Sequence, residues 1–130
     1  MSGSRRNRKK LIMVVDDEPE ILFIVKSVLS KHGYTVVESR SGEECLKELE
    51  HLLPDMILLD IAMPGIDGWE VCRKIKEKER TKKIPVSMLS IFSDKTHIER
   101  SLHYAGADHH MKKPIEFSEL LHTVDSMLSN

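Results

Sequence analysis

Short apolar runs alternate with amphipathic segments along the whole chain. The runs have the length of buried strands, and we predict strands at 11–15, 35–37, 56–60, 84–90 and 108–112. Between these runs, apolar residues recur every three or four positions, which predicts amphipathic helices. The predicted helices cover 19–33, 41–53, a segment that begins at 67 and runs into the charged stretch 76–83, 94–106 and 117–128. Strictly alternating strands and helices predict an α/β fold with a single doubly wound five-stranded parallel sheet and helices on both faces.

Local signals place the ends of several predicted helices. Pro19 suits a first helical turn, and Ser41, Asp67 and Asp94 can each cap the helix that follows. The apolar face of the second helix extends to Leu53. The helix after Asp94 has a thin apolar face, which includes Ile98 and Leu102, and the last strand is unusually polar. A chain of 130 residues with this pattern predicts one domain with one core region.

Charge is distributed unevenly along the chain. The net charge is −1, but residues 1–10 carry five basic and no acidic side chains, which leaves −6 on residues 11–130. We interpret residues 1–9 as a disordered basic leader and residues 10–129 as the folded domain. An acidic body does not favour nucleic acid, and the chain has no apolar run long enough for a membrane span or signal peptide. We therefore expect a cytoplasmic protein that binds neither DNA nor membrane through this chain, with Cys45 and Cys72 as buried free thiols.

Polar side chains follow the predicted strands at their carboxyl ends. If all strands are parallel, their carboxyl ends lie at one edge of the sheet, so these side chains share that edge. It is also the edge at which open α/β sheets bind their ligands. The residues are Asp16 and Asp17 after the first strand, Asp60 at the end of the third, Ser90 at the end of the fourth and Lys113 after the fifth.

Three acids at one edge are unfavourable unless a cation joins them. Two carboxylates about 4 Å apart repel by about 4 kcal/mol at an effective dielectric near 20. Hard oxygen ligands with open positions suit Mg²⁺, which also bridges to phosphate. Ser90 offers a hydroxyl and Lys113 a charge for phosphoryl oxygens. The set predicts Mg²⁺-dependent phosphoryl transfer to an aspartate.

The motifs that carry these residues resemble the receiver domain of two-component response regulators. They are Asp16-Asp17-Glu18, Leu59-Asp60-Ile61-Ala62-Met63-Pro64-Gly65, Pro85-Val86-Ser87-Met88-Leu89-Ser90 and Lys113-Pro114, and the resemblance covers residues 10–129. It implies the flavodoxin-like strand order 2-1-3-4-5. It also implies a switch that takes a phosphoryl group from a sensor histidine kinase or a histidine phosphotransfer protein, and that catalyses its own phosphorylation and dephosphorylation without being a conventional turnover enzyme.

The resemblance assigns a role to each matching position. Asp60 corresponds to the phospho-acceptor and Asp17 to a direct Mg²⁺ ligand, whereas Asp16 acts mainly through water. The backbone carbonyl of Ala62 corresponds to a further metal ligand. Ser90 corresponds to the switch hydroxyl and Lys113 to the phosphate-binding lysine. Because Ser90 leads directly into the thinly packed helix from 94, we also predict that this helix, the strand 108–112 and the last helix form the surface that regulates a downstream protein or output domain.

Two residues depart from the family pattern. Ile91 stands where a very small residue is usual, and its bulk narrows access to Asp60, restricts the switching loop, or simply adds to the core. His110 stands where Tyr or Phe is usual, which argues against readout by an aromatic rotamer; the plainer interpretation is an exposed strand residue, which we favour slightly.

Two other functions fit the fold class less well. A flavin or nucleotide site needs a phosphate-cradling loop after the first strand, where Asp16-Asp17-Glu18 instead repels an anion. An aspartyl phosphatase of another α/β family normally carries a second acid two residues after its nucleophile, where this chain has Ala62. The resemblance is equally compatible with a stand-alone regulator and with one domain of a longer protein.

Overall fold

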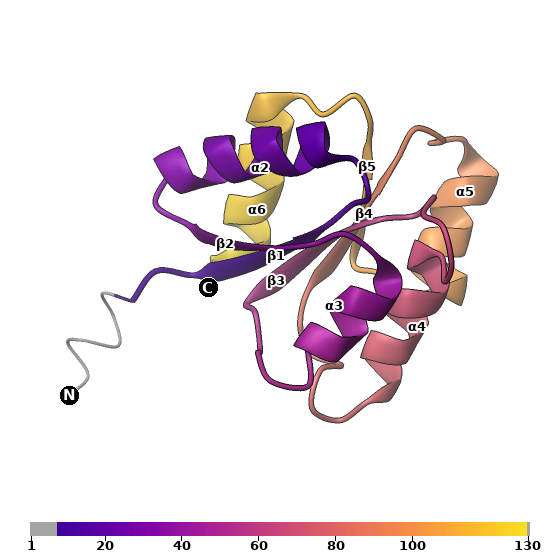
Figure 1. Ribbon diagram of the computed structural model, residues 1–130. Helices are drawn as coiled ribbons and strands as arrows, with labels where there is room; N and C mark the ends of the chain where they lie inside the picture. The colour runs from indigo at the N-terminus through magenta and orange to yellow at the C-terminus, as the bar shows by residue number, and fades with distance from the viewer. Residues whose placement is uncertain (1–7, 130) are drawn as a thin grey trace.

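The computed structural model describes residues 8–129, in which strands and helices alternate (Figure 1). The predicted leader 1–9 lies largely outside these residues. No helix within 8–129 is both long and apolar enough to cross a lipid bilayer. The elements are β1 (Leu11–Val15), α2 (Pro19–Lys31), β2 (Thr35–Ser39), α3 (Gly42–Glu48), β3 (Met56–Asp60), α4 (Gly68–Glu77), β4 (Val86–Ser90), α5 (Lys95–Glu99), the π-helix η1 (Arg100–Tyr104), β5 (His109–Lys112) and α6 (Phe117–Leu128).

The five strands form one parallel sheet in the order β2-β1-β3-β4-β5. This confirms the fold class and the strand order expected from the resemblance. Val15 pairs with Leu59, and Asp60 pairs with Leu89, so the carboxyl ends of β1, β3 and β4 lie level with one another. The register therefore brings the predicted strand-end side chains to one edge.

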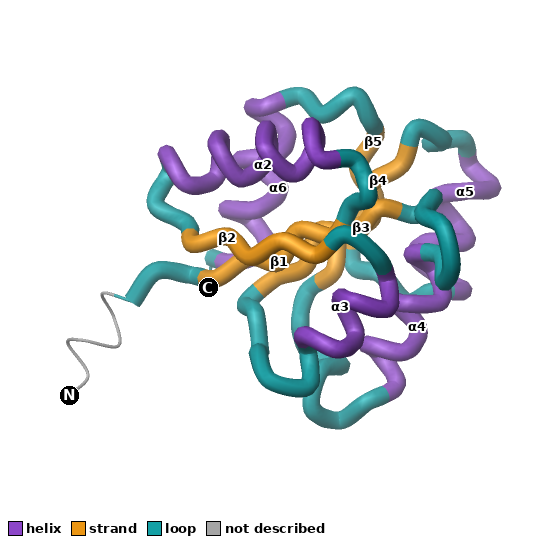
Figure 2. The backbone as a smooth tube through the Cα atoms, viewed as in Figure 1, coloured by secondary structure: helices purple, strands orange, loops and turns teal. Residues whose placement is uncertain are grey.

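Helices cover both faces of the sheet, as Figures 1 and 2 show. Successive side chains of a strand point to opposite faces, so β3 supplies Ile57 and Leu59 to one core cluster and Met56 and Leu58 to the other. The first cluster packs under α3 and α4, and the second packs under α2 and α6. Burial on both faces explains why β1 and β3 are continuous apolar runs.

The helix ends follow the predicted capping residues in two cases. Ser41 Oγ accepts a hydrogen bond from the Glu44 amide at 3.0 Å, and Asp67 Oδ1 accepts one from the Glu70 amide at 3.0 Å. Asp94 holds the N-cap position of α5 as predicted, but its carboxylate makes no capping hydrogen bond and pairs with the His97 ring instead.

Other predicted boundaries also differ from the structure. The prediction that Leu53 extends the apolar face of the second helix is wrong, because α3 ends at Glu48 and Leu53 is exposed. The predicted helix from 94 divides into α5 and η1, where Ala105 closes a wider turn by donating its amide to the Arg100 carbonyl at 2.9 Å. β2 extends to Ser39, whereas β4 begins two residues later than predicted and β5 one residue later.

Stacked side chains join η1 to α4. The Arg100 guanidinium lies 4.8 Å from the Trp69 ring centroid and 4.2 Å from that of Tyr104, and the Arg73 guanidinium lies 4.6 Å from the Tyr104 ring centroid. Nothing in α5 is buried. Cation–π stacking therefore supplies much of the contact that an apolar helix face supplies elsewhere in this fold.

Candidate functional site

Three carboxylates meet at the carboxyl edge of the sheet. Asp60 is the last residue of β3, and Asp16 and Asp17 directly follow β1. One oxygen of each lies within 4.8 Å of the others. Asp16 and Asp60 are buried, whereas Asp17 is exposed. The apolar strands hold two of these acids at the rim of the core, and the third faces solvent.

Lys113, directly after β5, supplies the positive charge at this cluster. Its side chain is only 7% exposed, and its Nζ donates to Asp16 Oδ2 at 2.7 Å. The same Nζ lies 3.3 Å from Asp60 Oδ1 and 3.5 Å from Glu18 Oε1. One ammonium therefore contacts three carboxylates, which leaves the cluster with excess negative charge.

The pKa values of Asp16, Asp60 and Lys113 are all raised at this cluster. Burial, together with the neighbouring Asp16 charge, raises the pKa of Asp60 to about 6 against the opposing charge of Lys113. Burial also raises the pKa of Asp16 despite its hydrogen bond from Lys113. Burial alone disfavours the Lys113 ammonium, but its hydrogen bond to Asp16 and the charge of Asp60 outweigh this and raise its pKa. An additional cation would relieve the remaining repulsion.

A hollow of about 190 Å³ opens over the carboxylates, and Ala62, Ser90 and Ile91 line it beside Asp17, Glu18, Asp60 and Lys113. All the predicted site residues except Asp16 line this hollow, and Asp16 contacts it through Lys113. Ile91 is 63% exposed, so the interpretation that it adds to the core is wrong. Ile91 instead lines the hollow together with Ser90.

Ser90 connects the hollow to the loop of residues 91–94. Its side chain is buried, and its Oγ accepts a hydrogen bond from the Phe92 amide at 2.9 Å. The interpretation of His110 as an exposed strand residue is wrong, because its ring is half-buried and hydrogen-bonds to this loop and to η1. The sequence offered no signal for its partner Ser101, a fully buried serine on a largely exposed helix.

The loop of residues 61–67 is fixed at both ends, a feature that the sequence analysis missed. A Cβ placed on Gly68 would lie 2.1 Å from the Asp60 carbonyl oxygen, so only glycine lets α4 begin this close to β3. Glu43 of α3 accepts a hydrogen bond from the Ile66 amide at 3.1 Å and lies against Gly65, whose φ is 79°. These contacts hold the segment that carries Ala62.

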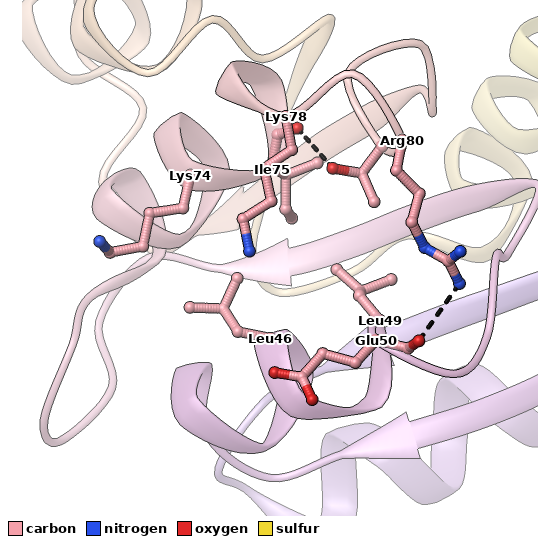
Figure 3. Close-up of a pocket in the computed structure, with 8 residues that line it drawn as sticks. Leu46, Leu49, Glu50, Lys74, Ile75, Lys78 and Arg80 are labelled. Carbon is pink, nitrogen blue, oxygen red and sulfur yellow. Dashed lines mark hydrogen bonds between the residues drawn. The ribbon is translucent and has the colours of Figure 1, made fainter.

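A second hollow, of about 250 Å³, lies between α3 and α4 (Figure 3). Leu46, Leu49 and Ile75 line it together with Lys74, Lys78 and Arg80, and Arg80 donates to the Glu50 carbonyl. It lies toward the carboxyl end of α4, whereas Asp60 is next to the amino end of that helix at Gly68. This hollow is therefore separate from the carboxylate cluster.

The carboxylate cluster fits a divalent cation. Its donors are hard oxygens, burial holds the pKa values of Asp16 and Asp60 above their ordinary values, and exposed Asp17 leaves the site open to water and ligand. The fold and this pocket together define the class of the protein: a doubly wound α/β protein with an acidic pocket at the carboxyl edge of its sheet.

Comparison with known proteins agrees with this class. The family model of the response regulator receiver domain matches residues 12–125, and the chain belongs to that family. The chain is 35% identical over 105 residues to the transcriptional regulatory protein AfsQ1 of Streptomyces coelicolor, covering 81% of this chain and 45% of AfsQ1. It is 32% identical over 117 residues to the phosphate regulon transcriptional regulatory protein PhoB of Rhizobium meliloti, covering 90% of this chain and 51% of PhoB. The chain thus spans about half the length of these curated relatives.

Solved structures show the same fold. A putative response regulator from Chloroflexus aurantiacus superposes with a TM-score of 0.90 at 32% identity, over 95% of this chain and 100% of that one. The response regulator TrrA of Thermotoga maritima, solved in complex with Mg²⁺ and a beryllium fluoride, gives a TM-score of 0.81 at 37% identity, over 92% and 99% of the two chains. This chain is therefore a receiver domain rather than a conventional enzyme.

Proposed function

We propose that this chain is a phosphorylation-dependent signalling switch in which Asp60 accepts a phosphoryl group from a histidine kinase or a histidine phosphotransfer protein. The observation that carries the proposal is the cluster of three carboxylates, Asp16, Asp17 and Asp60, with one buried lysine beneath an open hollow. Such a site offers a nucleophilic carboxylate oxygen, oxygen ligands for a divalent cation and a lysine for an anionic group. The acidic body and its membership of the receiver family favour a cytoplasmic protein partner over nucleic acid or membrane.

Each residue of the pocket has a separate role in phosphoryl transfer. A carboxylate oxygen of Asp60 attacks phosphorus while the phosphorus–nitrogen bond of the donor histidine breaks and the imidazole leaves. Lys113 moves from Asp60 toward a phosphoryl oxygen as that oxygen approaches. Asp16, Asp17, Asp60 and the Ala62 carbonyl would hold Mg²⁺, which when bound would supply positive charge to offset the phosphoryl oxygens. Later attack of water on phosphorus breaks the acyl-phosphate bond and restores the Asp60 carboxylate.

The added charge then acts on Ser90. Phosphorylation adds roughly −1.5 to −2 of charge, and the Ser90 hydroxyl lies at the same hollow. Its displacement pulls on Phe92 and so on α5 and η1. We infer that α5 with η1, β5 and α6 form the surface that regulates a downstream protein or output domain.

The proposal is tested by treating the protein with acetyl phosphate and Mg²⁺ and measuring intact mass. We expect one alkali-labile phosphoryl adduct, absent without Mg²⁺ and absent from Asp60→Asn. Asp55→Asn is the matched control, because Asp55 accepts the Leu11 amide at the opposite end of β3 and remains an acceptor as asparagine. An adduct of full yield in Asp60→Asn contradicts the proposal, and sustained turnover of small phosphate esters would favour a phosphatase instead.

A further inference from the structure

His110 of β5 is the centre of a hydrogen-bonded chain that joins three elements. Its Nδ1 lies 2.8 Å from Ser101 Oγ on η1. Its Nε2 lies 3.1 Å from the Phe92 carbonyl oxygen and 3.2 Å from Ser93 Oγ in the loop of residues 91–94. Trp69 of α4 donates its Nε1–H to the same Ser101 Oγ at 3.0 Å. One ring therefore ties the loop after Ser90 to both η1 and α4.

The groups at the two ends of this hydrogen-bond network determine which atoms carry the hydrogens. The Phe92 carbonyl only accepts, so His110 Nε2 carries a hydrogen and donates it. The Trp69 ring nitrogen only donates, so Ser101 Oγ accepts from it and directs its own hydrogen to His110 Nδ1. Every bond is satisfied by a neutral imidazole protonated at Nε2. Within residues 8–129 the Ser101 hydroxyl has only these two side-chain partners and is fully buried, so a second proton on His110 leaves the serine hydrogen without an acceptor.

The surroundings of His110 also disfavour a second proton. The titratable groups that face it are His109 on β5, His97 on α5 and Asp94 at the start of α5, whose carboxylate already pairs with His97. Met88, its partner on β4, and Trp69 are uncharged, and Arg100 of η1 stacks on Trp69. Burial, assisted by the charges of His109 and His97, lowers the pKa of His110 below its ordinary value. The ring is therefore neutral at pH 7.

Phe92 is held from both sides of its backbone. Ser90 Oγ accepts its amide hydrogen at 2.9 Å, and His110 Nε2 donates to its carbonyl at 3.1 Å. A movement of Ser90 toward Asp60 therefore strains or breaks the contact between Phe92 and His110. We propose that neutral His110 is a positioning residue: Ser101 anchors its ring at Nδ1, and the anchored ring holds the loop of residues 91–94 through Nε2. A second proton, which breaks the Ser101 anchor, or replacement of His110 frees the ring, releases this loop and so eases the response of Ser90. This deepens the proposed function and rests on it where Ser90 is concerned.

The first test measures hydrogen exchange at the Phe92 to Asp94 amides without metal or phosphodonor, in an Asp60→Asn background that removes the titration of Asp60. His110 binds a proton less readily in the closed loop than in an opened loop, where its pKa is the ordinary value near 6.5. Protection of these amides from hydrogen exchange is therefore greatest above about pH 6.5 and declines as the pH falls below that value. After correction for intrinsic exchange, we expect protection to fall about 3- to 10-fold between pH 7.5 and 5.5, the size of one net hydrogen bond.

Matched variants separate positioning from general stability. His110→Gln keeps a donor for the Phe92 carbonyl but does not titrate in this range, so its protection should be independent of pH. His110→Phe should lose protection at both pH values. His109→Gln, the adjacent histidine whose ring contacts Ser87 instead, should keep the full pH profile. An unchanged pH profile in His110→Gln overturns the proposal.

The second test uses beryllium fluoride with Mg²⁺ at pH 7.5 and follows Trp69, the single tryptophan, by fluorescence. His110→Phe should reach half-saturation at an about 3- to 10-fold lower beryllium fluoride concentration than wild type, and His109→Gln at the wild-type concentration. Equal concentrations for His110→Phe and wild type overturn the proposal. If wild type binds no beryllium fluoride at all, the proposed function fails, and the exchange test alone still decides the role of His110.

Discussion

Lys112 and Lys113 are neighbours in the sequence and lie in opposite environments. Lys112 is exposed at the end of β5, whereas Lys113 is buried against Asp16 and Asp60. We predict that Lys113→Ala lowers the free energy of unfolding of the metal-free protein by about 2–4 kcal/mol, because it leaves buried carboxylates unpaired. It should also strongly reduce the yield of the acetyl phosphate adduct. Urea unfolding and intact mass measure the two effects.

Lys112→Ala is the control for that prediction, because it removes the same charge without a buried partner. It should change the free energy of unfolding by less than about 0.5 kcal/mol and leave the adduct yield intact. Similar losses in both variants would show that net charge, and not the Lys113 contacts, governs the pocket.

Some site residues could be predicted from the sequence one at a time, and others could not. Asp60 is conspicuous because a carboxylate at the end of a buried apolar strand costs free energy without a function. Ser101 and His110 give no such signal, since a serine and a histidine in polar segments are ordinarily exposed. Their burial depends on Trp69, 32 positions before Ser101, and no local pattern reports a pairing at that distance.

The loop of residues 61–67 depends on a single helix side chain. Glu43 accepts the Ile66 amide, whereas the adjacent Glu44 accepts the Arg40 amide at the start of α3. We predict that Glu43→Ala speeds hydrogen exchange at Ile66 and raises the Mg²⁺ dissociation constant about 2- to 5-fold, since an exposed charge-assisted hydrogen bond is modest. Amide exchange and a Trp69 fluorescence titration with Mg²⁺ are the measurements.

Two variants separate that contact from a general effect on α3. Glu43→Gln keeps an acceptor and should restore most of the Mg²⁺ affinity. Glu44→Ala weakens the helix start but should leave exchange at Ile66 unchanged. If Glu44→Ala loosens Ile66 as much as Glu43→Ala does, the loop depends on helix stability and not on the Glu43 carboxylate.

Regular elements were predicted best where packing is apolar. The β1 and β3 strands match their predicted bounds because their runs are buried on both faces. The helix from 94 was predicted as one regular helix with Ile98 and Leu102 on its apolar face. It instead changes to a π-helix and buries Ser101 and Ala105, while Leu102 remains exposed. Hydrogen bonds and ring stacking decide its packing, and apolar periodicity does not report either of them.

At the scale of the whole molecule, the metal site opposes stability in the absence of a cation. Asp17 is an exposed member of the acidic cluster and contributes to the raised pKa of Asp60. We predict that Asp17→Asn unfolds at the same or a higher temperature without metal, because it relieves repulsion. It should need at least about tenfold more Mg²⁺ for the same rise in unfolding temperature. Thermal unfolding across a Mg²⁺ series tests both statements.

The opposite pattern would assign Asp17 a structural role: a lower unfolding temperature without metal and an unchanged response to Mg²⁺.

Local sequence patterns predict some features of the whole fold and leave others open. Alternating strands and helices predict a parallel sheet, but the order of its strands came from the family resemblance, since nothing in the periodicity of β2 or β4 says which strand lies beside β1.

The stacked attachment of α5 and η1 to α4 gives the molecule two different responses to denaturant. The sheet and its two core clusters expose much apolar surface when they unfold, so their stability falls steeply with urea. Separation of α5 and η1 from α4 parts charged and aromatic side chains and uncovers Trp69 and Ala105, which is much less apolar surface than the sheet exposes on unfolding. Its urea dependence and heat-capacity change are therefore smaller than those of the sheet. We expect this segment to open separately from the sheet, at a population that mild denaturant alters little.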